Sequence, residues 1–186
     1  MSPSVSQHTT VVNIRPAGSP DASALAALLA AYLAEQFPGH PGTSAEQLER
    51  DVLGGASGQR VLLAETGGMA VGFIAWHRVY DMHWAKAGAS IADLYVVPAR
   101  RGLGVAGALV ARVCAAARAE GARYLTGGAY DRASPIGRFY ERIAVAFDSV
   151  ECHCSGAAFR RLADLHGTPP RVIACGLPPK EWNYVE

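Results

Sequence analysis

The sequence predicts an α/β fold in which a mixed, largely antiparallel sheet is flanked by helices. Runs of β-forming residues come first, and Gly67-Gly68 joins two of them by a two-residue turn typical of an antiparallel hairpin. A strand–helix–strand succession follows, which implies a crossover connection and a parallel pair of strands. Together these observations predict an antiparallel meander with one parallel neighbour.

The N-terminal part predicts one strand and two helices. Val11–Arg15 is a short apolar strand candidate. Ser19-Pro20-Asp21 supplies an N-cap, a first-turn proline and a first-turn acid, and apolar residues continue at helical spacing up to Pro38-Gly39. Thr43-Ser44-Ala45-Glu46 has the form of a capping box, which predicts a second, short helix through about Leu53.

The middle of the chain predicts the meander and the crossover helix. Arg60–Thr66 and Met69–Tyr80 are the strands of the hairpin, Asp81–Gly88 is expected to be a connecting loop, and Ala89–Val97 is the next strand. From Arg101 the chain is expected to turn into a helix that ends near Glu120, with Gly121 as its stop.

The C-terminal part predicts a strand over Arg123–Tyr130, a short helix opened by Ser134-Pro135, and a strand over Val145–Cys154. Residues 155–186 are expected to be a C-terminal extension, with a helix capped by Ser155 and one further strand candidate near Arg171–Cys175.

Composition limits the domain organisation and the partners. The chain has 186 residues, of which 50% are hydrophobic and 18% are charged. That is enough for one packed core but not for two. We therefore expect a disordered segment over residues 1–10 and a single domain over residues 11–186. The net charge is +1 and the basic residues are scattered, so we expect no nucleic-acid partner.

The termini and the cysteines indicate a cytoplasmic protein. Met1–Thr10 is polar and lacks the apolar region of a secretion signal, and charged residues interrupt the alanine-rich stretches before they reach membrane-spanning length. We expect no membrane partner, and reduced cysteines. Cys152-His153-Cys154 has no second pair nearby and lies in a strand-like run, so we expect small buried residues there and no metal site.

A glycine-rich turn between a strand and a helix is the segment that points to chemistry. Arg101, Gly102 and Gly104 occupy it. Glycine lets the backbone come close to a ligand, and the first free N–H groups of the helix point at that ligand. The helix dipole adds partial positive charge, and Arg101 and Arg100 are available to complement it, so the turn is a candidate site for phosphate oxygens.

Two other interpretations of this turn stay open. Gly102-x-Gly104-x-x-Gly107 satisfies the dinucleotide fingerprint, with Asp131 about one strand later as a candidate ribose-binding acid. Against it, Pro98–Arg101 separates the turn from its strand, and a hairpin meander comes before the turn instead of strand–helix units. The turn is also interpretable as purely structural, without a ligand.

The residues around the turn resemble a known motif. Val96-x-Pro98-x-x-Arg101-Gly-Leu-Gly104-Val-Ala106 is similar to the Arg/Gln-x-x-Gly-x-Gly/Ala acyl-CoA motif of the GNAT N-acetyltransferase superfamily, and the order of elements matches from about Val11 to Phe147. Val71-Gly-Phe through Tyr80-Asp81, Lys86 and Asp93-Leu-Tyr-Val resemble its spermidine/diamine N-acetyltransferase branch. The resemblance implies transfer of an acetyl group from acetyl-CoA to a primary amine of a small molecule, such as a polyamine, an aminoglycoside or an amino acid.

The resemblance also implies where the coenzyme binds. The strand ending at Val97 is expected to splay from Arg123–Tyr130, so that the backbone of Leu94, Tyr95 and Val96 receives the pantetheine arm and an N–H near Val96 faces the thioester oxygen. The pyrophosphate is expected on the turn and the start of its helix, which comprise Arg101, Gly102, Leu103, Gly104, Val105, Ala106 and Gly107.

The catalytic candidates also follow from the resemblance. Tyr140 matches the family tyrosine that protonates the coenzyme's sulfur, although Ile136, Tyr140 and Ile143 share a helical face and Tyr140 is also interpretable as packing. Asp93 is the candidate general base, directly or through a water; pairing with a nearby cation is the alternative. The branch has a Glu-Asp pair where this chain has Ala92-Asp93.

The acceptor site is expected near the loop after the hairpin. Asp81, His83 and Trp84 are its candidates, because an acid with aromatic neighbours suits an ammonium group. The alternative is an exposed hairpin tip.

Departures from the family pattern leave rival functions open. Ala133 stands where the family has an asparagine, seven residues before the tyrosine. With the missing Glu, this allows a non-catalytic acyl-CoA-binding sensor; a dinucleotide-binding protein is the third hypothesis. The superfamily often forms dimers, so a homodimer is expected to be possible, and residues 155–186 are available to dock on the core, close that dimer or border the acceptor site.

Overall fold

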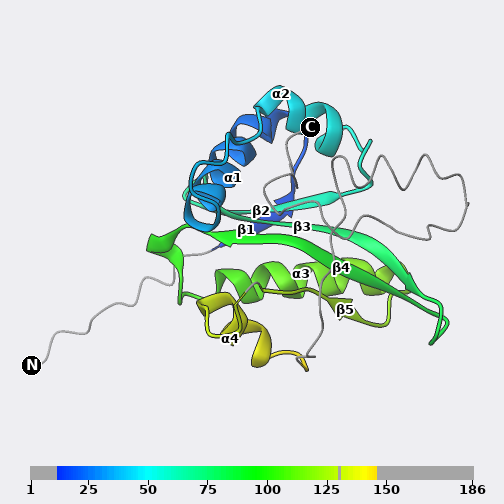
Figure 1. The fold of residues 1–186 in the computed structure, drawn as a ribbon. Coiled ribbons are helices and arrows are strands. Elements are labelled where there is room, and N and C mark those ends of the chain that lie inside the picture. The colour runs from blue at the N-terminus through cyan, green and yellow to red at the C-terminus, as the bar shows by residue number, and fades with distance from the viewer. Residues whose placement is uncertain (1–11, 130, 146–186) are drawn as a thin grey trace, which may run out of the picture. The chain divides into compact units, whose positions relative to one another are not determined.

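The computed structural model describes residues 12–129 and 131–145 of the chain (Figure 1). The chain divides into two compact units, Met1–Gly137 and Arg138–Glu186. The predictions for residues 1–10, for the strand after Val145 and for residues 155–186 lie outside the described residues.

A mixed sheet forms the centre of the first unit, as predicted. Its described strands lie in the order β1 to β5, the first three junctions are antiparallel, and β4 pairs with β5 in parallel. The strands are β1 (Asn13–Pro16), β2 (Arg60–Thr66), β3 (Met69–Asp81), β4 (Lys86–Val96) and β5 (Leu125–Thr126). Because β4 and β5 are parallel, the chain crosses over between them, and helix α3 (Val105–Ala119) makes this connection after the end of β4.

Helices cover both faces of this sheet (Figure 1). One face carries α1 (Ala22–Gln36), preceded by η1 (Ser19–Asp21), and α2 (Ala45–Leu48), followed by η2 (Glu49–Leu53). The other face carries α3 (Val105–Ala119), which follows the short η3 (Pro98–Arg100). Helix α4 (Pro135–Glu141) crosses the boundary between the two units.

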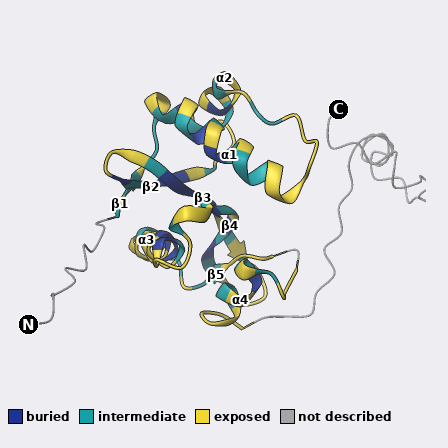
Figure 2. Ribbon diagram, turned by 90° about the vertical axis from the view of Figure 1, so that its left-hand side faces the viewer, coloured by how far each residue is buried: buried dark blue, intermediate teal, exposed yellow. Residues whose placement is uncertain are grey.

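The core fills the space between the sheet and the helices (Figure 2). Leu63 and Phe73 point to the α1 face, where they pack with Leu25 and Leu28. Because successive side chains of a strand alternate between faces, Ile74 points to the α3 face. Burial of such side chains supplies roughly 1.5–3 kcal/mol each, so both faces contribute to the stability of the sheet.

The local signals of the first hairpin are confirmed. Strand β2 has the predicted bounds, and Gly67 and Gly68 both have positive φ, 58° and 78°. Left-handed backbone at both central positions is what a type I′ hairpin turn requires, and glycine adopts it without steric cost.

Two predicted boundaries are wrong. The predicted loop over Asp81–Gly88 is much shorter, because the pairing continues to Asp81 and Lys86 and leaves only a four-residue turn. The predicted strand over Arg123–Tyr130 forms a ladder only at Leu125 and Thr126 within the described residues. In both cases the extent of pairing with the neighbouring strand decides the boundary, and the composition of the segment does not.

The crossover helix begins later than predicted. It was expected to start near Arg101, but Gly102 and Gly104 have φ of 75° and 83°, which no right-handed helix contains, so α3 starts at Val105. The predicted stop is confirmed, since Gly121 follows the helix with φ 85°.

Candidate functional site

The turn before α3 leaves a continuous row of backbone amides without a protein acceptor. The N–H of Arg101 donates to the oxygen of Pro98 at 3.2 Å, and the N–H of Ala108 donates to the oxygen of Gly104 at 3.0 Å, which begins the helical ladder. Between these two donors, the amides from Gly102 to Gly107 have no acceptor in the part of the chain that the structure describes. With the positive end of the α3 dipole behind them, these amides suit an anion.

The glycines of the turn also have open space where a side chain would begin. A Cβ built at Gly102, Gly104 or Gly107 meets no atom within 4 Å. Gly107 lies in the first turn of α3 without a positive φ, and glycine inside a helix costs up to about 1 kcal/mol relative to alanine. Packing in the described fold therefore does not require this glycine, and the space beside its backbone is open to a ligand.

The edge of β4 next to β5 is also open beyond its first half. Among the described residues, the two strands pair at Ala89 with Leu125 and at Ser90 with Thr126 and at no other position. Further along β4, no residue in the described ranges pairs with that edge up to Val96. The predicted splay between these strands is therefore present among the described residues.

The alternation of the β3–β4 ladder decides which amides of β4 are available at this edge. The N–H of Val97 donates to the oxygen of Val71 on β3 at 3.0 Å, so the amides of Val97 and Tyr95 point to β3 and those of Leu94 and Val96 point to the open edge. Two of the three predicted pantetheine contacts thus present an N–H there. The amide of Tyr95 turns away, and its side chain is buried beside Tyr32.

The guanidinium of Arg101 is bound to the protein itself. Its Nε donates to the Val96 oxygen at 2.8 Å, and its Nη2 donates to both carboxylate oxygens of Glu35 at 2.7 and 2.9 Å. Tyr95 donates its hydroxyl to the same carboxylate at 2.9 Å. Burial acts to raise the pKa of Glu35, but the hydrogen bonds from Arg101 and Tyr95 outweigh it and the net pKa is lowered.

Sequence reasoning missed Glu35. It is 66 residues before Arg101, so no local pattern links the two. The available signal was its position: Glu35 lies in the last turn of α1, where the helix dipole disfavours an acid, and such a residue needs a cationic partner.

Asp93 lies on β4 opposite Ala75, on the α1 face of the sheet. It is partly buried, and burial raises the pKa of its carboxyl group. Within the described ranges, the carboxyl group of Asp93 makes no hydrogen bond or ion pair. The residue before it, Ala92, is an extra residue in a β-bulge, because Trp76 pairs with Ile91 and Ala75 pairs with Asp93. A partly buried carboxyl with a raised pKa has the properties of a proton acceptor.

Tyr140 lies on the part of α4 that belongs to the second unit, where its ring is 5.5 Å from that of Phe139. In the first unit, Asp131 accepts the N–H of Ala133 at 2.8 Å, so it caps the turn before α4. The roles predicted for Tyr140 stay predictions.

The three acceptor candidates lie at the tip of the β3–β4 hairpin. Asp81 Oδ1 accepts the N–H groups of His83 at 2.8 Å and of Trp84 at 3.1 Å, so this carboxylate organises the turn. Trp84 is 71% exposed, and the Nζ of Lys86 lies 5.7 Å from the centre of its ring. These contacts and exposures match the alternative interpretation of this segment as an exposed hairpin tip. Both hydrogen bonds use Oδ1 of Asp81, so Oδ2 is available for other contacts.

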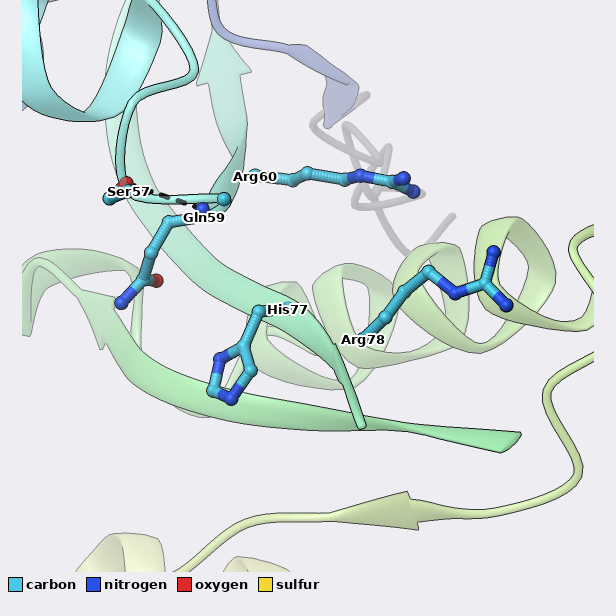
Figure 3. Close-up of a pocket in the computed structure, with 6 residues that line it drawn as sticks. Ser57, Gln59, Arg60, His77 and Arg78 are labelled. Carbon is cyan, nitrogen blue, oxygen red and sulfur yellow. Dashed lines mark hydrogen bonds between the residues drawn. The ribbon is translucent and has the colours of Figure 1, made fainter. Parts of the chain in front are cut away.

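A separate hollow of about 370 Å³ lies at the start of β2 and the middle of β3. Figure 3 shows Gln59 and His77 pointing to one side, and Arg60 and Arg78 to the other. The two arginines share the carboxylate of Glu120. None of the residues predicted for the coenzyme, the acceptor or catalysis lines this hollow.

Within the described residues, no cluster of three or more metal-ligating side chains occurs. None of the helices in the same ranges has the length and apolar character to span a membrane.

A family model and a solved structure both relate this chain to acetyltransferases. The family model described as the acetyltransferase (GNAT) family matches residues 25–144. A ribosomal-protein-alanine N-acetyltransferase from Brucella melitensis biovar Abortus 2308 is 26% identical, with 78% of this chain and 99% of that chain covered and a TM-score of 0.64. No curated protein matches the sequence significantly.

Two further solved structures share the fold at lower identity. An integron cassette protein from V. cholerae is 19% identical, with 82% of this chain and 97% of that chain covered and a TM-score of 0.69. An aminoglycoside acetyltransferase from an uncultured soil metagenomic sample, in complex with sisomicin, is 16% identical, with 77% and 95% covered and a TM-score of 0.66.

Proposed function

The chain belongs to the acetyltransferase (GNAT) family, and from that premise we propose that it transfers the acetyl group of acetyl-CoA to the primary amine of a small molecule by direct attack. One observation carries the proposal: the amides from Gly102 to Gly107, at the positive end of α3, have no acceptor in the described part of the chain. Such a row is suited to the diphosphate of the coenzyme.

The open edge of β4 completes the proposed coenzyme site. Leu94 and Val96 would hydrogen-bond the pantetheine arm as an added strand does, because their amides point to that edge. The amide of Val96 is in addition a candidate donor to the thioester oxygen, where negative charge develops during the attack. Bound acetyl-CoA would supply the activated acetyl group.

Proton transfers are assigned to Asp93 and Tyr140. The attacking amine must lose a proton, and a partly buried carboxyl with a raised pKa is better matched to that task than an exposed one. Tyr140 is proposed to protonate the departing thiolate, on the resemblance of its surroundings to the family motif.

For the acceptor we propose a small molecule with a primary amine. The resemblance to the spermidine/diamine branch favours a polyamine, while the solved relatives include enzymes for aminoglycosides and for ribosomal-protein alanine. Asp81, His83 and Trp84 stay proposed acceptor contacts. Unchanged amine KM values in Asp81→Ala would remove that role from Asp81. A cytoplasmic location and a homodimer complete the proposal.

One experiment separates this function from its rivals. The purified chain is incubated with acetyl-CoA and polyamines, aminoglycosides, amino acids or peptides with an N-terminal alanine, and release of the coenzyme thiol is followed. Acceptor-dependent release supports the proposal. Coenzyme binding without release with any acceptor would indicate the sensor, and binding of NAD(H) in place of CoA would indicate the dinucleotide protein.

A further inference from the structure

Arg101 carries a positive charge next to the candidate diphosphate site, yet its directed hydrogen bonds go to the protein. Nε reaches the oxygen of Val96, and Nη2 reaches both oxygens of Glu35. The guanidinium carbon also lies 5.5 Å from the centre of the Tyr95 ring. The planar fork of arginine makes these contacts simultaneously, which the point charge of a lysine does not.

These contacts tie together three elements of the first unit. Val96 is the last residue of β4, Glu35 lies in the last turn of α1, and Arg101 is the first residue of the glycine-rich turn. The turn is thereby fixed at its first residue, while the amides from Gly102 to Gly107 have no acceptor among the described residues. Positive φ values make glycine turns soft, so an anchor at one end restricts the conformations that the amides sample.

We propose that Glu35 is a positioning residue for the coenzyme: it holds Arg101 against Val96 and so keeps the amides of the turn aimed at the diphosphate. This inference rests on the proposed function, because it needs a coenzyme in the turn. The rival account is that Glu35 competes with the diphosphate for the guanidinium of Arg101. The two accounts give opposite signs for removal of the Glu35 charge.

The test is the dissociation constant of CoA for the full chain, measured by calorimetry for the wild type, Glu35→Gln and a matched control. Glu120→Gln is that control. The side chain of Glu120 is 34% exposed, as is that of Glu35. The carboxylate of Glu120 binds two arginines, and the residue follows the C-terminal end of α3, at the other end of the helix from the glycine-rich turn. Positioning predicts that Glu35→Gln weakens CoA binding roughly three- to tenfold, the range of a partly exposed ion pair with directed hydrogen bonds, and that Glu120→Gln leaves it unchanged.

A second variant separates position from charge. Arg101→Lys keeps the positive charge but loses the fork that joins Val96 to Glu35, so it should weaken CoA binding about as much as Glu35→Gln does. The double variant should be no weaker than either single one, because both remove the same anchor. In activity assays the loss should appear in the KM for acetyl-CoA and not in the KM for the amine. A merely destabilised fold would instead lower the active fraction without changing either constant.

The outcomes are distinct. Tighter or unchanged CoA binding by Glu35→Gln overturns the inference. Wild-type CoA affinity in Arg101→Lys also overturns it, because the positive charge at residue 101 would then be sufficient for binding without the contacts to Val96 and Glu35. If the wild type itself binds no CoA ester, the proposed function fails first, and the positioning role fails with it.

Discussion

Gly104→Ala tests whether the turn binds a ligand, because a second glycine of the same helix offers a matched control. Gly104 precedes α3 with φ 83°, and Gly121 follows it with φ 85°; a Cβ at either position meets no atom within 4 Å. An L-residue in left-handed backbone costs roughly 1–2 kcal/mol. Alanine also lowers the conformational entropy of the unfolded chain relative to glycine, which offsets about 0.4–1 kcal/mol of this cost.

Both alanine variants should therefore lose about 0.5–1.5 kcal/mol of folding stability, which lowers the melting temperature by a few degrees. Only Gly104→Ala should impair the coenzyme site. Gly104 lies within the amide row, so a substitution there acts directly on the proposed site. Loss of one charge-assisted hydrogen bond to the diphosphate, about 1.5–3 kcal/mol, weakens CoA binding roughly 10- to 100-fold.

The assay is thermal unfolding of both variants without ligand, followed by calorimetric titration with CoA. Equal melting temperatures together with a loss of CoA affinity confined to Gly104→Ala would support the coenzyme site. Equal CoA affinity of the two variants would refute it, because the same strain would then have the same effect at both ends of the helix.

Three further predictions concern titratable groups. Burial raises the pKa of Asp93, so folding stability falls as the pH rises from the ordinary value of 3.8 through the raised one. Asp93→Asn should therefore have a higher melting temperature than the wild type at pH 7, and the two melting temperatures should converge in acid. Its rate of acetyl transfer should drop roughly 100-fold or more. Melting curves at a series of pH values, together with turnover measurements, check both expectations. Tyr140→Phe should reduce kcat by a similar factor with the CoA dissociation constant nearly intact, and unchanged turnover would remove Tyr140 from the mechanism. The hydrogen bond from Arg15 lowers the pKa of Asp21 from 3.8 to about 2, so its stabilisation is present above pH 4 and is lost as the pH falls toward 2. Allowing for partial exposure of the pair, Asp21→Asn should cost about 1–2 kcal/mol in urea unfolding at pH 7, and an equal effect at pH 2 would contradict this.

Local signals in the sequence were sufficient to predict much of the fold. Gly67-Gly68 located the first hairpin, and the glycines before α3 located the turn, because both segments need left-handed backbone that other residues avoid. The mixed topology followed from the order of the elements. In each case the determining interaction lies within a few residues of chain.

Features that depend on distant segments were not predictable in the same way. The contact between Glu35 and Arg101 spans 66 residues, and the bulge at Ala92 depends on how β4 registers with β3. Likewise, β5 is short because its ladder to β4 stops after two residue pairs, although the composition of Arg123–Tyr130 suits a longer strand. The sequence therefore located the turn and the strand end as a segment, while their role in coenzyme binding stays a prediction and the contacts of each residue are visible only in the fold.

Because one edge of β4 is only partly paired, two neighbouring amides of this strand can be compared with each other in a hydrogen-exchange experiment. Neighbouring amides alternate in direction, so Tyr95 is hydrogen-bonded to β3 and Val96 faces the open edge. Exchange with deuterium should be slow at the first and fast at the second, although both lie on one strand and experience the same global unfolding. The ratio of the two rates then reports occupation of the edge, independently of changes in overall stability.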